Sequence, residues 1–291
     1  MQWTFLLQNA NLAIQKPKRE RESVVGAAEF QDVSYEVIGP VARICHARPD
    51  RGNAEGTRLL DEIDAALKVA NRDEAVRVVI IGGVGKNFSG GHDVKEAMGR
   101  PNIVEARYAY EEERYLGHCL RLWDFPKPTI AQVQGACIAG GFMVANMCDL
   151  VVASDDAFFA DSTCAMLAAA ATEVLVHPWV LGLRAAKEFL YTGRKMMAEE
   201  ARQLGMVNRV VPRAELEQAT LALANEIAKA PPFAIKLLKR SLNKTADMQG
   251  FRNAIQAHFD LHELSHTTHE YDQIRAGGLD ATIARTKAGI A

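Results

Sequence analysis

The stretch at residues 127–149 constrains the fold of this chain more than any other. Residues 129–133 are apolar and rich in β-branched side chains, which predicts a buried strand. A glycine pair, Gly140-Gly141, then precedes the small apolar run at residues 142–147, which predicts a buried helix. The start of such a helix presents unpaired backbone N–H groups and suits a developing oxyanion. The alternative is a tight turn whose glycines serve only close packing.

A second stretch repeats this arrangement. Residues 77–81 predict another buried strand, and the loop that follows carries the glycine pair Gly90-Gly91 just before His92. Two loops of this kind can each direct one N–H group at a single carbonyl oxygen. The pair therefore favours an oxyanion hole over two unrelated turns.

These two loops resemble those of the crotonase superfamily, the enoyl-CoA hydratase/isomerase family. Phe88-Ser89-Gly90-Gly91-His92-Asp93 matches the family's F-S-x-G-x-D loop, and the glycine pair at Gly140 matches its second loop. The resemblance implies that the backbone N–H groups of His92 and Gly140 hold the thioester oxygen of an acyl-CoA. It covers roughly residues 30–259, and several motifs occur in the family's order.

The resemblance also implies an architecture. We expect an α/β fold, a crotonase-type spiral of ββα turns with a helical C-terminal region. The expected division is an N-terminal extension at residues 1–29, a spiral core at 30–210 and a helical region with a tail at 211–291. Family members are trimers or dimers of trimers, and they act in the metabolism of fatty acids and other lipids.

The resemblance extends to coenzyme A. The segment from Arg48 to Ala54 matches the family pattern R-P-x-x-x-N-A, which lies along the adenine and phosphates. We expect Arg51 to meet phosphate charge. The candidate contacts with coenzyme A are Arg51, Ala54, Gly90, Gly91, His92, Asp93 and Val94. A polar loop before a helix is the alternative for Arg51. Coenzyme A enters as part of the substrate, and we expect no permanently bound cofactor.

The acid–base residues of family hydratases are missing. Two glutamates normally transfer protons there, and this chain has Met143 and Thr163 at their places. Asp161 and Glu173 are the candidate replacements, followed by His177. A similar F-F-x-D segment and a later H-P-W-x-L-G motif occur in actinobacterial-type enoyl-CoA hydratase homologues that also lack the two glutamates. The structural alternatives are a turn cap for Asp161, a surface ion pair for Glu173 and a packed loop residue for His177.

Residues 102–123 predict one long helix, and the resemblance implies that this helix borders the acyl pocket. Some dehydratase relatives place a glutamate on this helix. We nevertheless expect the run Glu111-Glu112-Glu113 to form a solvated face. The last helix that we expect spans residues 250–266, and a polar tail follows it.

Three reactions or roles remain open from the sequence. An enoyl-CoA hydratase-like lyase with displaced acid–base residues is the first. An isomerase, a decarboxylase or a C–C hydrolase that forms a thioester enolate is the second. A non-catalytic protein that binds acyl-CoA is the third, motivated by the substitutions at Met143 and Thr163.

Composition excludes several other classes. The 291 residues are 48% hydrophobic, which supports a substantial core, and the formal net charge of −2 argues against a nucleic-acid partner. Five cysteines without a C-x-x-C pair predict neither a zinc site nor a disulfide framework, so we expect no metal and a reducing cytoplasm. No apolar run approaches the roughly 20 residues of a membrane span, so we expect no membrane partner.

Overall fold

The computed structural model describes residues 30–101, 103–278, 280–281 and 284, so the predicted extension at residues 1–29 lies outside the described part. A six-stranded sheet has the order β1-β2-β3-β4-β6-β9, and a three-stranded sheet has the order β5-β7-β8. The strands are β1 (Val33–Ile38), β2 (Val41–His46), β3 (Val78–Gly83), β4 (Thr129–Val133), β5 (Ala136–Ile138), β6 (Leu150–Ser154), β7 (Phe158–Ala160), β8 (Met196–Met197) and β9 (Arg209–Val211).

Strand pairing explains the run of buried residues at β3. Strands β1 and β2 form the predicted antiparallel hairpin, whereas the other neighbours in the six-stranded sheet, from β2 to β9 in the order given, pair in parallel. In the three-stranded sheet, β5 and β7 are parallel and β7 and β8 are antiparallel. Val78 and Ile80 face a small core under α10 (Leu216–Ala228), and Val79 and Ile81 face the main core. Both faces are therefore covered, as parallel sheets require.

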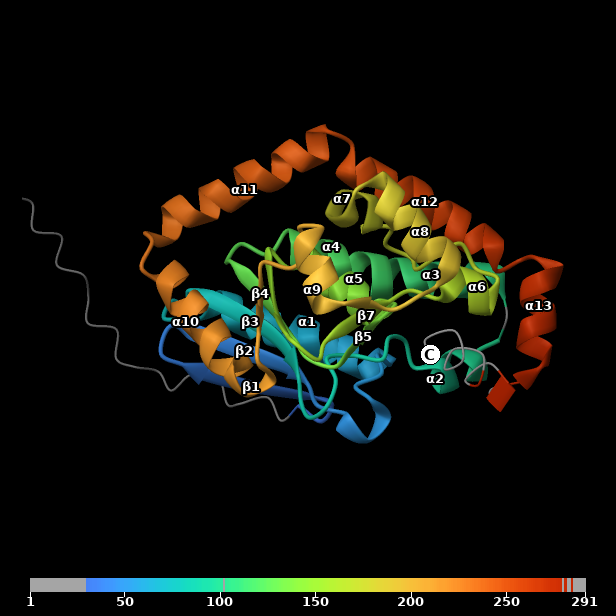
Figure 1. The fold of residues 1–291 in the computed structure, drawn as a ribbon, viewed down its shortest axis with the longest axis horizontal. Coiled ribbons are helices and arrows are strands. Elements are labelled where there is room, and N and C mark those ends of the chain that lie inside the picture. Colours follow the sequence, from blue (N-terminus) through green and yellow to red (C-terminus); the bar gives the residue numbers. More distant parts are fainter. Residues whose placement is uncertain (1–29, 102, 279, 282–283, 285–291) are drawn as a thin grey trace, which may run out of the picture.

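Helices cover the sheets and form the C-terminal region (Figure 1). The remaining helices are α1 (Thr57–Arg72), α2 (Val94–Gly99), α3 (Val104–Glu111), α4 (Gly117–Trp123), α5 (Gly140–Met147), α6 (Thr163–Leu167), α7 (His177–Leu181), α8 (Leu183–Thr192), α9 (Ala198–Gln203), α11 (Pro232–Met248), α12 (Phe251–Ser265) and α13 (His269–Ala276). After β9 only helices follow in the described residues. The α/β spiral with a helical C-terminal region is thus confirmed, while the boundary at residue 210 stays a prediction.

One predicted helix and the predicted C-terminal tail differ from the structure. The long helix at residues 102–123 is interrupted by a π-helical turn, Glu112–Leu116, between α3 and α4. Beyond the last predicted helix, residues 269–276 form α13, where we expected a polar tail. In Figure 1, α3 and α13 lie toward the same end of the molecule as α6. In the described part of the chain, no helix is long and apolar enough to cross a membrane.

Candidate active site

The two glycine loops lie against each other. Ser89 joins them, because its N–H donates to Ala136 O at 3.1 Å and its carbonyl accepts from Ile138 N at 3.0 Å. Gly91 has φ +86°, a left-handed conformation that glycine adopts without strain. Ala139 has φ +48° and ψ −106° immediately before α5. Such strain in a non-glycine residue is typical of functional loops.

The N–H groups of His92 and Gly140 are available to a ligand. Neither amide donates a hydrogen bond to any residue that the structure describes. Gly140 is the first residue of α5, where the amide has no helical partner. A Cβ atom at Gly140 would overlap a Glu55 carboxylate oxygen and lie 2.7 Å from His92 Nδ1, and one at Gly91 would lie 2.8 Å from Ile138 O. The glycines therefore allow the approach of the two amides.

The His92 side chain contributes more than the sequence indicated. Its Nε2 lies 2.9 Å from Glu173 Oε2, and its Nδ1 lies 3.6 Å from Glu55 Oε2. The ring stacks on Tyr115 with 3.7 Å between the ring centroids. Burial alone would lower the pKa of His92, but the two carboxylates outweigh it and raise the pKa to about 10. The imidazolium thus joins two buried carboxylates.

Glu173 is a buried pocket residue and not part of a surface ion pair. Its loop is held by a hydrogen bond from Val174 N to Met143 Sδ at 3.2 Å. Glu173 Oε1 lies 3.5 Å from His262 Nε2, on the opposite side from His92. Burial would raise the pKa of Glu173, but the charges of His92 and His262 hold it well below its usual range. The carboxylate therefore stays ionised.

Asp161 lies behind the pocket wall and does not line the pocket. Its carboxylate accepts hydrogen bonds from Thr163 N at 3.0 Å and from Thr172 N at 3.3 Å. His177 Nε2 lies 3.3 Å from Asp161 Oδ2, and both side chains are fully buried. Asp161 and His177 thus fix the loop that ends in Glu173, in agreement with the structural alternatives for both residues.

A cavity of about 160 Å³ joins the loops to the C-terminal helices. Its lining residues are Gly90, His92, Val94, Ala97, Met98, Glu111, Tyr115, Ile138, Ala139, Ser162, Thr163, Leu167, Thr172, Glu173, His262, His266, Tyr271, Ile274 and Arg275. The expectation of a solvated face was wrong for Glu111, which is buried with Oε2 3.3 Å from His262 Nε2. Glu112 and Glu113 are exposed as expected.

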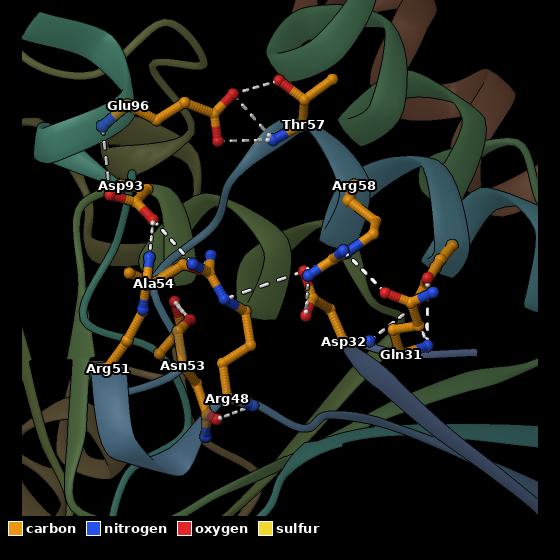
Figure 2. A network of polar contacts seen from close by, with 12 residues as sticks. Gln31, Asp32, Arg48, Arg51, Asn53, Ala54, Thr57, Arg58, Asp93 and Glu96 are labelled. Carbon is orange, nitrogen blue, oxygen red and sulfur yellow. Dashed lines mark hydrogen bonds and ion pairs between the residues drawn. The ribbon is translucent and has the colours of Figure 1, made fainter. Parts of the chain in front are cut away.

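Three of the candidate residues for coenzyme A, Arg51, Ala54 and Asp93, lie around Arg48 (Figure 2). Arg48 donates to Ala54 O at 2.7 Å and to Asp93 Oδ2 at 2.8 Å. Arg51 Nη1 lies 3.8 Å from the same Asp93 oxygen, and 54% of the Arg51 side chain is exposed. Asp93 and Ala54 therefore have structural partners, whereas Arg51 retains solvent-facing charge. Gly90 lines the cavity beside the loops.

Sequence reasoning missed the polar groups that surround Glu173. Glu55 was not among the candidates from the sequence, and the structure pairs it with His92 in an isolated parallel bridge shortly before α1. His262 and His266 lie one turn apart at the end of α12, and this i, i+4 spacing was visible in the sequence. The lining residues of α13 gave no signal, because the tail was polar without clear periodicity.

Known proteins are similar to this chain in sequence and fold. The family model described as enoyl-CoA hydratase/isomerase matches residues 37–286. A curated relative named putative enoyl-CoA hydratase EchA13, from Mycobacterium tuberculosis, is 39% identical and covers 82% of this chain and 81% of its own. A solved structure of a probable enoyl-CoA hydratase from Mycobacterium smegmatis is 46% identical, with a TM-score of 0.77, over 80% of this chain and 94% of its own.

The relatives do not share one reaction. A protein named 4-chlorobenzoyl coenzyme A dehalogenase-2, from an Arthrobacter species, is 31% identical over 73% of this chain and 78% of its own. The mycobacterial relatives agree with the expected likeness to actinobacterial-type homologues. By sequence and by fold, this chain belongs to the enoyl-CoA hydratase/isomerase family, the crotonase superfamily.

Proposed function

We propose that this protein is an enoyl-CoA hydratase-like lyase that uses Glu173 in place of the two family glutamates. The observation that carries the proposal is the position of the Glu173 carboxylate, 2.9 Å from the side chain of His92, whose own N–H is one of the two available amides. A proton-transfer group and an oxyanion hole therefore share one cavity.

The proposed reaction needs only one carboxylate. The thioester oxygen accepts hydrogen bonds from the N–H groups of His92 and Gly140, which stabilise the enolate by roughly 3 kcal/mol per donor. Glu173 accepts a proton from water as the water oxygen bonds to C3. The same carboxyl group then returns that proton to C2. The electron pair of the C2=C3 double bond forms the new C2–H bond, so no other reactant is required. His92 and His262 hold Glu173 in place from its two sides.

A second candidate is an isomerase of the same fold. One carboxylate that removes a proton from one carbon and returns it to another is sufficient for this reaction, and Glu173 lines the cavity with its Oε2 2.9 Å from His92 Nε2. The dehalogenase named above illustrates how far reactions diverge among relatives. Decarboxylation, C–C hydrolysis and simple acyl-CoA binding are the outcomes that a failure of both candidates would favour.

The remaining assignments belong to the same proposal. Arg51, with its exposed guanidinium, would meet a phosphate of coenzyme A, and the Gly90–Val94 loop would contact the thioester end. A trimer or a dimer of trimers is supported by four exposed apolar side chains on α11, Phe233, Leu237, Leu238 and Leu242. The five cysteines are free thiols, which supports a location in the cytoplasm. Acyl-CoA chemistry supports a role in lipid metabolism.

Mass spectrometry of CoA products tests the reaction. Purified protein is incubated in deuterated water with a panel of enoyl-CoA and 3-hydroxyacyl-CoA thioesters. Gain or loss of one water supports the hydratase, and deuterium uptake without water addition supports the isomerase. Glu173→Gln should lower turnover by about 10²-fold or more, while Glu112→Gln, on the exposed side of the neighbouring π-helical turn, should leave it unchanged. Equal turnover in the two variants would rule out the role of Glu173.

A further inference from the structure

The end of α12 carries a sequence of metal-binding type. Residues 262–266 read His-Glu-Leu-Ser-His, which places two imidazoles one helical turn apart on one face. This His-Glu-x-x-His spacing is that of zinc sites on helices. His262, Glu263 and His266 are all buried, with 2%, 3% and 8% of their surface exposed. The motif therefore faces the interior and not solvent.

A fourth potential ligand comes from a distant part of the chain. Glu111, the last residue of α3, approaches the α12 motif. One ligand atom from each of Glu111, His262, Glu263 and His266 lies within 4.8 Å of all the others. Ligand atoms in a tetrahedral zinc site lie roughly 3.3 Å apart, as follows from metal–ligand distances of about 2.0 Å. A small contraction of the side chains would close the four ligands around one ion.

Two polar atoms of this cluster lack a hydrogen-bond partner in the part of the chain that the structure describes. Nδ1 of His266 and Oε1 of Glu263 are buried and have no hydrogen-bond partner among the described residues. The other carboxylate oxygen of Glu263 is held by Arg107 Nε at 3.2 Å, which fixes the side chain and leaves Oε1 facing the cluster. Buried polar atoms without partners are unusual in a folded protein, and a bound ion would satisfy both of them.

His262 is oriented as a metal ligand. Its Nδ1 lies 2.9 Å from the carbonyl oxygen of Ala171, so that Nδ1–H donates to this carbonyl. This hydrogen bond directs Nε2 toward Glu111 Oε2, at 3.3 Å. Metal-binding histidines commonly hold their second nitrogen on a backbone carbonyl in this way.

We propose that Glu111, His262, Glu263 and His266 bind one divalent transition-metal ion of the zinc class. Two imidazole ligands favour Zn²⁺ or Co²⁺ over Mg²⁺ and Ca²⁺, which prefer oxygen ligands. The ion would lie in the wall of the acyl cavity, beyond Glu173 as seen from His92, since Glu173 Oε1 is 3.5 Å from His262 Nε2. Its four ligands are complete without substrate, although His262 Nε2 also lies against Glu173, the residue of the proposed reaction.

Titration calorimetry of the full chain, freed of metal with a chelator, tests the proposal. Zn²⁺ should bind with a stoichiometry of one per chain, and Co²⁺ should bind with the visible absorption of a tetrahedral ion. His266→Ala should weaken Zn²⁺ binding by about 100-fold or more. His269→Ala is the matched control, because His269 is exposed and lies outside the cluster. This control should change the affinity by less than about twofold.

Glu111→Gln provides a second variant that keeps the shape of the side chain. It should also weaken Zn²⁺ binding by about 100-fold, with the thermal midpoint of unfolding measured to show that the variant folds. The absence of saturable Zn²⁺ binding would overturn the proposal, as would an affinity that neither variant changes. Mg²⁺ that binds as tightly as Zn²⁺ would also contradict it. All of these measurements are made without a thioester, so they are independent of any result on turnover.

Discussion

Asp161 offers a measurable test of how the Glu173 loop is held. The carboxylate is fully buried and accepts hydrogen bonds from Thr163 N and Thr172 N, the second of which lies next to Glu173. Burial alone would raise the pKa of Asp161, but His177 and the bonds from Thr163 hold it at about 2, compared with an ordinary value of 3.8. One pKa unit corresponds to about 1.4 kcal/mol, so ionised Asp161 stabilises the fold by about 2 kcal/mol at pH 7.

The sign follows from the lower pKa in the folded state. The unfolded chain takes up the proton first, near pH 4, so this stabilisation is complete above that pH and is lost as the pH falls toward 2. About half of it is lost by pH 3. Asp161→Asn removes the titrating group, and its destabilisation relative to the native chain should be at least about 2 kcal/mol at pH 7. At pH 3 this difference should be smaller by about 1 kcal/mol.

Urea unfolding at pH 7, 5 and 3 measures these differences. Asp50→Asn is the control, because Asp50 is exposed and the substitution should shift stability by less than about 0.5 kcal/mol at each pH. Other carboxylates titrate in both proteins and cancel in the comparison. A difference between the native chain and Asp161→Asn that does not change with pH would refute the reasoning, because it would show that Asp161 is not held ionised.

Three further predictions concern the loops, coenzyme A and assembly. Gly140→Ala places a methyl carbon 2.6 Å from His92 Cε1 and should lower kcat about 100-fold, whereas Gly99→Ala meets nothing within 4 Å and should not; equal kcat values would contradict the oxyanion assignment. Arg48→Ala leaves Asp93 without its close buried ion pair and should destabilise the chain by about 3 kcal/mol in urea unfolding. Arg51→Ala should instead weaken coenzyme A binding with little loss of stability. The reverse pattern would make Arg51 the structural residue and Arg48 the residue that binds coenzyme A. Leu238→Glu on α11 should reduce the molar mass measured by light scattering, and an unchanged mass would exclude this surface from the assembly.

The glycine loops could be predicted from sequence because their geometry is local. A strand, a glycine pair and a helix start follow one another within a few residues, and the backbone alone determines where the amides of His92 and Gly140 point. The spiral fold was implied by the resemblance that these loop motifs carry. Neither inference needed knowledge of which distant side chains meet.

The environment of Glu173 could not be predicted, because it depends on contacts between distant segments. His92, Glu111 and His262 come from three different parts of the chain. His92 and His262 both contact the Glu173 carboxylate, and Glu111 contacts His262. The π-helical turn after Glu111 adds a further obstacle. A helical pattern assumes about 3.6 residues per turn, whereas the wider turn changes which side chains face inward. Glu111, the last residue of α3, is buried, while Glu112, the first residue of the π-helical turn, is exposed.

Met143 shows how the loss of a family glutamate and the position of Glu173 are connected. In the family pattern, Met143 stands where a proton-transferring glutamate is expected, and its thioether cannot take that role. Its sulfur instead accepts the N–H of Val174, the residue directly after Glu173. A glutamate at position 143 would place a second buried carboxylate beside Glu173, at the cost of repulsion between the two charges. Met143 avoids that repulsion and anchors the loop through Val174. Met143 thus argues against hydration by the two family glutamates and at the same time favours the position from which Glu173 reaches the cavity.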